Sequence, residues 1–144
     1  MSLLDRLKKH EGTKRGKNGL HAPYKDSLGK LTIGYGILIE PDEGGLYEEE
    51  AEYLLNNRAN KAQVQAQSLP WFKRIDQTRQ EVVVEMIFNL GLSRFMGFKN
   101  MIAALEKQDY KEAAKEGRDS KWFNQVKGRG VTLMNIMETG NNNQ

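Results

Sequence analysis

The chain has 144 residues, of which 38% are hydrophobic, and this is enough for one domain of ordinary size with a buried core. Lys and Arg together number 22 against 19 Asp and Glu, and this net charge of +3 suits an anionic polymer but falls far short of a nucleic-acid-binding composition. Because cysteine is absent and His10 and His21 are the only histidines, we expect no disulfide, no metal site and no cofactor.

The sequence also shows no membrane or export signal. No apolar run approaches the ~18 residues of a membrane span. The N-terminal residues MSLLDRLKKH lack the basic-then-apolar order of a signal peptide. We therefore expect a soluble product of the cytoplasm without stable membrane association, which would need another component to release it if it acts outside the membrane.

The first part of the chain combines helix and sheet signals. Residues 2–11 are expected to form an amphipathic helix with a capping box at its start and Gly12 at its end. Over 13–37, glycines and short β-favouring pieces predict a small hairpin sheet with turns at K-N-G and S-L-G. After a PDEGG loop, a long helix is expected over 47–67, with acidic residues at its start as the helix dipole favours.

The remainder is expected to be helical. In DQTRQEVVVEMIFNLG, five apolar residues share one helical face, which predicts a core helix; they are Val82, Val83, Met86, Ile87 and Leu90. Shorter helices should follow at about 98–107, 109–117, 119–125 and 129–138.

These elements predict an α+β fold for a single domain over residues 1–144. A small antiparallel sheet lobe (12–46) and a larger helical lobe (68–140, with the N-terminal helix 2–11) would be joined by the helix at 47–67, with a cleft between the lobes.

Two isolated carboxylates, Glu11 and Asp26, stand in the otherwise basic and polar interval HEGTKRGKNGLHAPYKDSLGKLTIGYG. Hydrolysis of a glycosidic bond needs such a pair, one protonated to donate to the leaving oxygen and one ionised to activate water. A helix C-terminus would disfavour ionised Glu11, whereas N–H groups of a turn would favour ionised Asp26. Lone acids at such positions are also common on surfaces, so spacing alone leaves both interpretations open.

A family resemblance favours the catalytic interpretation. HEG followed by YKDSLGKLTIGYG resembles the active-site stretch of the phage-type lysozymes, the glycoside hydrolase family of the T-even phage lysozyme. EEEAEYLL resembles the start of the interlobe helix of that family, and FNLG its signature after the central helix. GF-N at 97–100 and WFNQ…R…TG at 122–140 resemble its C-terminal region. The resemblance covers nearly the whole chain and implies a lysozyme-like fold.

The resemblance implies roles for individual residues. Glu11 matches the general acid, Asp26 the second carboxylate, and Thr32 the threonine whose hydroxyl helps to hold the attacking water, with net inversion at the anomeric carbon. Arg129 matches an arginine that orients the catalytic glutamate, and a purely structural salt bridge is the alternative.

Sugar contacts are expected at Phe88, Asn89 and Asn100. Phe88 could equally belong to the core, whereas Asn89 should be exposed. Asn100 could cap a helix or bind an acetamido group. Trp122 is expected in the core.

The chain also departs from the family pattern. The interval between the two acids is longer than usual, so extra residues within KRGKNGLHAP should lengthen the hairpin and add Lys14, Arg15 and Lys17 near the active site. Ile37 replaces a common histidine, which should leave the chemistry intact, and Thr132 replaces a second arginine, which weakens the charge network.

The implied activity is that of a muramidase, which hydrolyses the β-1,4 bond between N-acetylmuramic acid and N-acetylglucosamine in bacterial peptidoglycan. A lytic transglycosylase, which needs one acid, and an inactive wall-binding or virion structural module are the alternatives. We expect a monomer whose partner is peptidoglycan, with no nucleic acid. A phage endolysin that waits in the host cytoplasm and acts on the periplasmic wall, and a virion-carried lysozyme, would look alike in sequence.

Overall fold

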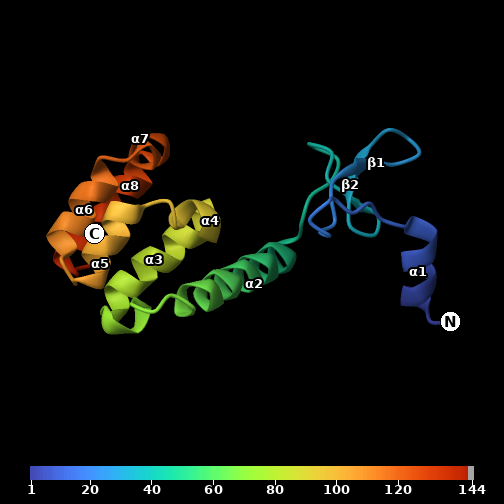
Figure 1. Ribbon diagram of the computed structural model, residues 1–144. Helices are drawn as coiled ribbons and strands as arrows, with labels where there is room; N and C mark the ends of the chain where they lie inside the picture. The colour runs from blue at the N-terminus through green and yellow to red at the C-terminus, as the bar shows by residue number, and fades with distance from the viewer. Residues whose placement is uncertain (143–144) are drawn as a thin grey trace. The chain divides into compact units, whose positions relative to one another are not determined.

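The structure, a computed structural model, describes residues 1–142 and divides the chain into two compact units (Figure 1). The N-terminal unit comprises Met1–Tyr53 and the helical unit Leu54–Gln144. The predicted α+β class is confirmed, because a small three-stranded antiparallel sheet accompanies a majority of helices. The assignment of the whole chain to one domain with a cleft between lobes stays a prediction.

The N-terminal unit begins with helix α1, Leu3–Glu11. Its predicted capping box is confirmed, since the Ser2 side chain accepts from the Asp5 N–H and the Asp5 side chain accepts from the Ser2 N–H. Gly12 ends the helix at φ 64°, a left-handed angle that favours glycine, and its N–H donates to the Lys8 carbonyl.

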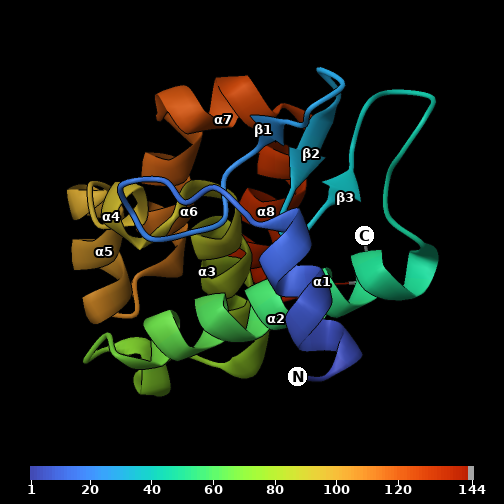
Figure 2. The same ribbon diagram turned by 90° about the vertical axis from the view of Figure 1, so that its right-hand side faces the viewer.

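Three short strands follow: β1 (Tyr24–Lys25), β2 (Leu31–Ile33) and β3 (Ile37–Leu38). They lie side by side in that order, and both neighbouring pairs are antiparallel (Figure 2). The central strand places Thr32 opposite Tyr24 on one side and Leu38 on the other. The predicted hairpin sheet is therefore confirmed, with a tight turn at the S-L-G segment, where the Gly29 N–H donates to the Asp26 carbonyl.

Helix α2, Glu48–Gln67, is the predicted long helix and begins with three consecutive glutamates. The remaining elements belong to the helical unit. They are η1 (Phe72–Arg74), α3 (Gln77–Leu90), α4 (Leu92–Phe95), α5 (Lys99–Glu106), α6 (Tyr110–Arg118), α7 (Lys121–Val126) and α8 (Gly128–Thr139).

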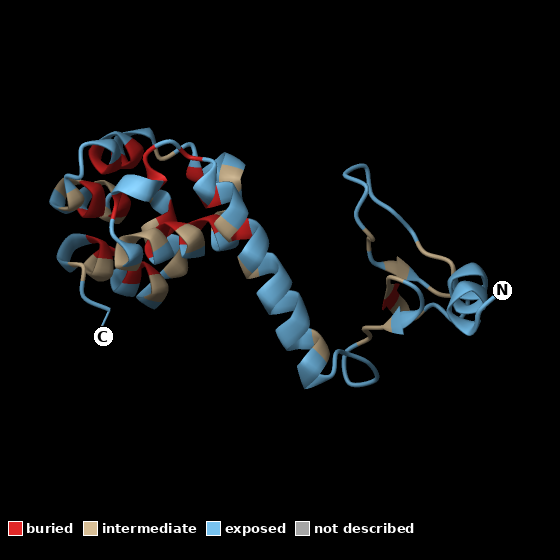
Figure 3. Cartoon of the chain, turned by 90° about the horizontal axis from the view of Figure 1, so that it is seen from below, coloured by how far each residue is buried: buried red, intermediate tan, exposed pale blue. Residues whose placement is uncertain are grey.

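Helix α3 is the predicted core helix. Val82, Val83, Met86 and Ile87 are all buried, and Leu90 packs against the core. Figure 3 shows the buried residues concentrated in the helical unit, whereas α1 is exposed along its length. The buried α3 side chains each remove apolar surface from water, which stabilises the folded state by about 1.5–3 kcal/mol per side chain.

Two short helical turns, η1 and α4, were not predicted from the sequence. Both are too short to show a helical period. Each is held by a buried aromatic ring, Phe72 in η1 and Phe95 in α4, so tertiary packing selects the turn. The four helices predicted over 98–138 are confirmed as α5 to α8, with ends within a few residues of those expected.

The Arg79 guanidinium connects the start of α3 with the end of α8. Its Nε and Nη2 donate to the carbonyls of Met137 and Glu138 at 2.7 and 3.1 Å, and its Nη1 pairs with Asp76 at 2.9 Å. It also lies over the Tyr110 ring, 3.7 Å from the centroid. Because helix-terminal carbonyls lack partners within the helix, this single side chain both caps α8 and fastens it to α3.

We expect Arg79→Met to lower the free energy of unfolding of the helical unit by about 2–4 kcal/mol, since it leaves two carbonyls and Asp76 Oδ1 without their side-chain donor. Urea denaturation followed by circular dichroism would measure the loss. Arg74→Met is the matched control, because Arg74 is exposed and has no ion pair within residues 1–142. Equal stability of the two variants would contradict this role for Arg79.

The same contacts predict a pH dependence. Burial raises the pKa of Asp76, but hydrogen bonds from Arg79 outweigh it and hold the pKa below its ordinary value. A lowered pKa stabilises the folded state above the unfolded-state pKa of about 3.9, and this contribution disappears as the pH falls through the folded-state value. Solvent screening limits it to about 1 kcal/mol, because 45% of the Asp76 side chain is exposed.

Asp76→Asn should therefore be less stable than the natural chain at pH 7, and the difference should shrink as the pH falls below about 4. Urea midpoints measured from about pH 2 to about pH 7, a range that spans the ordinary pKa of an aspartate, would test this. Glu106→Gln, at an exposed position of α5, removes the same charge away from Arg79 and is the matched control. A constant gap between Asp76→Asn and the natural chain at all pH values would rule out the linkage.

Candidate active site

Glu11 is the last residue of α1, and its side chain reaches the turn that connects β2 with β3. A Cβ atom at Gly36 would lie only 2.7 Å from Glu11 Oε2 and 2.9 Å from its Cδ. Gly36 also has φ 82°, in the left-handed region. The backbone angle therefore favours glycine at this position, and the Glu11 carboxylate would have to move to admit a Cβ.

Asp26 opens the tight turn between β1 and β2. Its Oδ1 accepts from the N–H groups of Leu28 and Lys30 at 2.9 and 2.8 Å, as the D-S-L-G motif predicts. The main chain closes the same turn, because the Asp26 N–H donates to the Lys30 carbonyl at 2.9 Å. These three bonds fix the position of the carboxylate relative to β2.

Thr32 lies at the centre of β2. It is the one polar residue that is buried among the described residues, with 3% of its surface exposed. Its Oγ1 donates to the Lys30 carbonyl at 2.9 Å. Because a hydroxyl has one proton and two lone pairs, the oxygen remains able to accept a hydrogen bond from a water molecule.

These three predicted residues line one cavity of about 620 Å³ within the N-terminal unit. Tyr24, Gly36 and Leu38 also line it. Other polar side chains complete the wall: His10, Lys25, Lys30 and Glu43. The chain segments 10–11, 24–32, 36–38 and residue 43 thus converge on one cavity that holds three carboxylates and a buried hydroxyl.

The sequence reasoning missed Lys30 and Glu43. The Lys30 ammonium lies 2.8 Å from Glu43 Oε2 and thereby ties the 40–45 loop to the Asp26 turn. Glu40 strengthens this attachment, because its Oε1 accepts from the Leu31 N–H at 2.9 Å. Thirteen positions separate the pair in the sequence without any motif, so only the fold reveals it.

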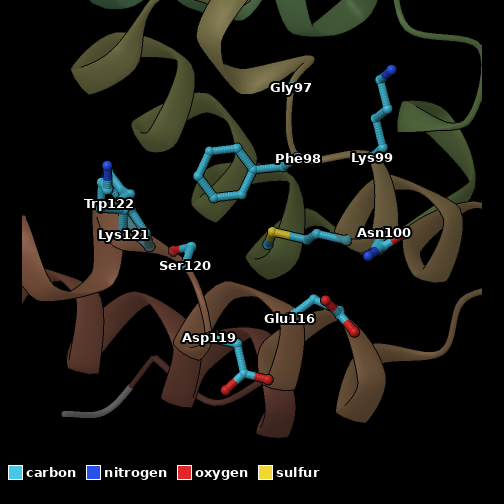
Figure 4. Close-up of a pocket in the computed structure, with 10 residues that line it drawn as sticks. Gly97, Phe98, Lys99, Asn100, Glu116, Asp119, Ser120, Lys121 and Trp122 are labelled. Carbon is cyan, nitrogen blue, oxygen red and sulfur yellow. The ribbon is translucent and has the colours of Figure 1, made fainter.

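Asn100 lies in a second pocket, of about 340 Å³, within the helical unit. In Figure 4 the Phe98 ring lies between Trp122 and Asn100, and Glu116 lies below them in the view. Phe98 and Trp122 meet edge to face, with ring centroids 6.1 Å apart. Asn100 does not cap α5, because the N-cap residue is Phe98 and no side chain caps that helix. It therefore remains available to line the pocket.

Asn89 and Phe88 lie at the end of α3 but in different surroundings. Asn89 is exposed and its Oδ1 accepts from Trp122 Nε1 at 2.9 Å, which links it to the Asn100 pocket. Phe88, 39% exposed, instead lines a separate apolar pocket of about 300 Å³ with Val84 and Arg129. Trp122 itself is buried, as predicted.

Arg129, near the start of α8, forms an ion pair with Glu85 of α3, with 2.9 Å between Nε and Oε2. This is the structural salt bridge that the sequence left open. Both side chains are more than a third exposed, so the pair contributes little stability, about 0–1 kcal/mol. An orienting action of Arg129 on Glu11 stays a prediction.

Metal-binding clusters and helices that could span a membrane are both absent from the described part of the chain. Over residues 1–142, no group of three or more acidic or histidine side chains is arranged to hold a metal ion. Within the same residues, none of the helices combines the length and the apolar character needed to cross a membrane.

Comparison with protein families adds an independent finding. The sequence model of the family described as "Phage lysozyme" matches residues 8–136. The matched range includes the three residues that meet in the N-terminal cavity as well as both pockets of the helical unit.

Individual relatives agree with this match. "Probable T4-type lysozyme 1" of Dictyostelium discoideum is 27% identical, and the alignment covers 96% of this chain and 95% of that protein. "Probable T4-type lysozyme 2" of the same organism is 26% identical with the same coverage. The "Pre-baseplate central spike protein Gp5" of Enterobacteria phage T4 is 28% identical, over 98% of this chain but only 28% of that protein.

The Glu11–Gly36 contact yields a prediction about stability. We expect Gly36→Ala to lower the free energy of unfolding of the N-terminal unit more than Gly34→Ala. Both glycines have positive φ, 82° and 62°, so both variants should lose about 1–2 kcal/mol through backbone strain. Only at position 36 would the new Cβ also meet the Glu11 carboxylate, whereas nothing lies within 4 Å of a Cβ at position 34.

Thermal unfolding of both variants, compared with the natural chain, would test this contact. A small additional loss is expected for Gly36→Ala, because the exposed Glu11 side chain must leave its contact with the turn. Equal losses at the two positions would show that Glu11 does not pack on the turn.

Proposed function

Because the chain belongs to the phage lysozyme family, we propose that it is a muramidase that hydrolyses the β-1,4 bond between N-acetylmuramic acid and N-acetylglucosamine in bacterial peptidoglycan. The family supports a lysozyme-type peptidoglycan hydrolase in general. One observation supports the particular mechanism: Glu11, Asp26 and Thr32 line the same cavity although they come from three separate segments of the N-terminal unit.

In this proposal the Glu11 carboxylic acid donates its proton to the glycosidic oxygen, and the bond between that oxygen and the anomeric carbon breaks. The Asp26 carboxylate accepts a proton from a water molecule whose oxygen attacks the anomeric carbon from the opposite face. Thr32 Oγ1 accepts the other hydrogen of that water, which orients it. The product has inverted configuration, and exchange with solvent returns the proton to Glu11.

The local structure supports this division of roles. The Asp26 turn supplies two N–H donors to one carboxylate oxygen and leaves the other oxygen, Oδ2, without a bond to the described residues. The Thr32 hydroxyl donates its one hydrogen bond to the Lys30 carbonyl, so in this arrangement it acts as an acceptor toward water. An inverting pair needs room for water, with carboxyl groups about 6.5–9.5 Å apart.

The helical unit provides the proposed sugar contacts. The Asn100 amide beside the Phe98 and Trp122 rings combines a polar group with aromatic surface, as carbohydrate-binding pockets require. Asn89 is oriented by Trp122 and would extend this surface. Phe88 is exposed in its own apolar pocket and would contact the polymer there. We also propose that the Arg129 guanidinium orients the Glu11 carboxylate. Its Nε pairs with Glu85, and its other nitrogens would serve Glu11.

A lytic transglycosylase is the closest alternative within enzymes, because it needs one acid and uses the hydroxyl of the substrate as the nucleophile. The ordered Asp26 turn and the buried Thr32 hydroxyl in the same cavity favour a hydrolase. An inactive wall-binding or structural module would have no need for this convergence.

We further propose that the protein acts as a monomer on peptidoglycan, reaching the periplasmic wall from the host cytoplasm during lysis. The alignment with T4-type lysozymes over 95% of their length favours a free enzyme. A virion-borne role is the second candidate, because the chain also matches part of a phage spike protein.

The test is digestion of purified Gram-negative peptidoglycan in H₂¹⁸O, with mass spectrometry of the released muropeptides. Hydrolysis should give reducing N-acetylmuramic acid ends that carry one ¹⁸O, whereas 1,6-anhydro ends without ¹⁸O would establish a transglycosylase. No release by folded protein would support a binding or structural module.

Variants assign the roles in the same assay. Glu11→Gln and Asp26→Asn should each lower the initial rate of release by about 10²-fold or more, because each removes an acid–base group. Asp26→Asn keeps an oxygen that can accept from Leu28 and Lys30, so the turn should persist and only the charge is lost. Glu49→Gln on α2 is the control and should retain activity. Natural activity in folded Glu11→Gln would overturn the assignment.

A further inference from the structure

The extra residues between the two candidate catalytic acids form an ordered hairpin, residues 14–22, which we call the basic hairpin. Its two strands are joined by the isolated bridge between Arg15 and His21. The Ala22 N–H donates to the Lys14 carbonyl at 2.8 Å, and the Gly16 N–H donates to the Leu20 carbonyl at 2.9 Å. The segment thus has a defined shape and can present side chains in fixed directions.

His21 attaches the basic hairpin to Thr13 and Tyr35, which lie within two residues of Glu11 and Gly36 of the candidate catalytic cavity. The His21 Nδ1 lies 2.7 Å from the Thr13 hydroxyl, two residues after Glu11. The imidazole also meets the Tyr35 ring edge to face, with centroids 5.1 Å apart. Tyr35 directly precedes Gly36, against which the Glu11 carboxylate packs. A polymer chain bound at Glu11 would therefore pass beside the hairpin.

The hairpin presents positive charge without internal partners. Lys14, Arg15 and Lys17 are all exposed, and none of them forms an ion pair within residues 1–142. Arg15 is partly engaged, because its Nη1 donates to the Gly19 carbonyl at 2.9 Å, which supports the tip of the turn. Within the hairpin, Lys14 and Lys17 form no side-chain hydrogen bond or ion pair with the described residues.

Charge is segregated along the N-terminal unit. Residues 6–30 contain eight Lys and Arg against two acids, Glu11 and Asp26. Residues 40–52 contain seven acids and no Lys or Arg. Such separation attracts and orients an anionic polymer more effectively than the same charges would if they were mixed.

We propose that the basic hairpin is a docking surface for the carboxylate groups of peptidoglycan stem peptides, with Lys14 and Lys17 as the contacting cations. This inference rests on the proposed function, because it extends the surface on which that substrate would lie. The partner is a flexible carboxylate polymer and not a nucleic acid, since no residue of the hairpin offers an aromatic face for base stacking; the His21 ring is already packed on Tyr35.

The experiment measures retention of the protein on insoluble, purified peptidoglycan sacculi, on ice, where retention depends on binding and turnover is slow. Lys14→Gln/Lys17→Gln should be retained about two- to tenfold less tightly than the natural chain at low salt, and the difference should vanish at about 0.5 M NaCl. Arg15 stays in place so that the hairpin keeps its shape. Lys14→Arg/Lys17→Arg, which preserves both charges, should bind as the natural chain does.

Two controls isolate the site and the chemistry. Lys73→Gln/Lys107→Gln removes the same charge from exposed positions of the helical unit and should bind normally. Sacculi whose carboxylates have been amidated should retain the natural chain and Lys14→Gln/Lys17→Gln equally. If the natural chain still bound amidated sacculi more tightly than Lys14→Gln/Lys17→Gln, the hairpin would be binding phosphate or another anion, and the proposal would be overturned.

The outcome is separable from that of the proposed function. Unreduced retention of Lys14→Gln/Lys17→Gln, or an equal loss in Lys73→Gln/Lys107→Gln, would refute the docking surface even if muropeptides are released at normal temperature. Conversely, absence of muropeptide release would refute the muramidase while the retention assay still reports on the hairpin.

Discussion

The candidate site depends on the packing of the Glu11 carboxylate against the backbone of Gly36. The Glu11 side chain at the end of α1 lies there so close to the turn between β2 and β3 that a Cβ atom at position 36 would displace it. The contact joins the helix to the sheet at the residue proposed to donate the proton. Its position determines where the scissile oxygen would lie, and misplacement by ~1 Å can cost about 10²-fold in rate.

The Asp26 turn organises the other side of the cavity. Lys30 takes part four times: its N–H donates to Asp26 Oδ1, its carbonyl accepts from the Asp26 N–H and the Thr32 hydroxyl, and its ammonium pairs with Glu43. One residue of the turn thus fixes the second carboxylate, directs the threonine hydroxyl and attaches the 40–45 loop. Because these bonds share one residue, the cavity wall should respond as a unit to changes in this turn.

The helical unit has a different physical basis. A buried apolar core around α3 supplies its stability, and the Arg79 side chain ties the last turn of α8 to the start of α3. In the N-terminal unit Thr32 and the turn hydrogen bonds take the place of such a core. Few buried apolar side chains and many local hydrogen bonds are typical of regions that open more easily than a packed core.

The sequence by itself determined the features that depend on local chemistry. The capping box placed α1, the D-S-L-G turn placed the Asp26 carboxylate, and the apolar face from Val82 to Leu90 identified the core helix. These signals are visible because caps, turns and helical faces involve residues within four positions of one another, or repeat with a fixed period.

Only the tertiary structure decided the contacts between distant residues. Neither the Lys30–Glu43 pair nor the Glu85 partner of Arg129 has a sequence signal, and Asn100 lines a pocket in place of capping a helix. The turns at Phe72 and Phe95 are likewise too short for a period and exist because their rings are buried. Such choices depend on which surfaces meet in three dimensions, and hydrophobic burial, which is not directional, leaves no fixed spacing along the chain.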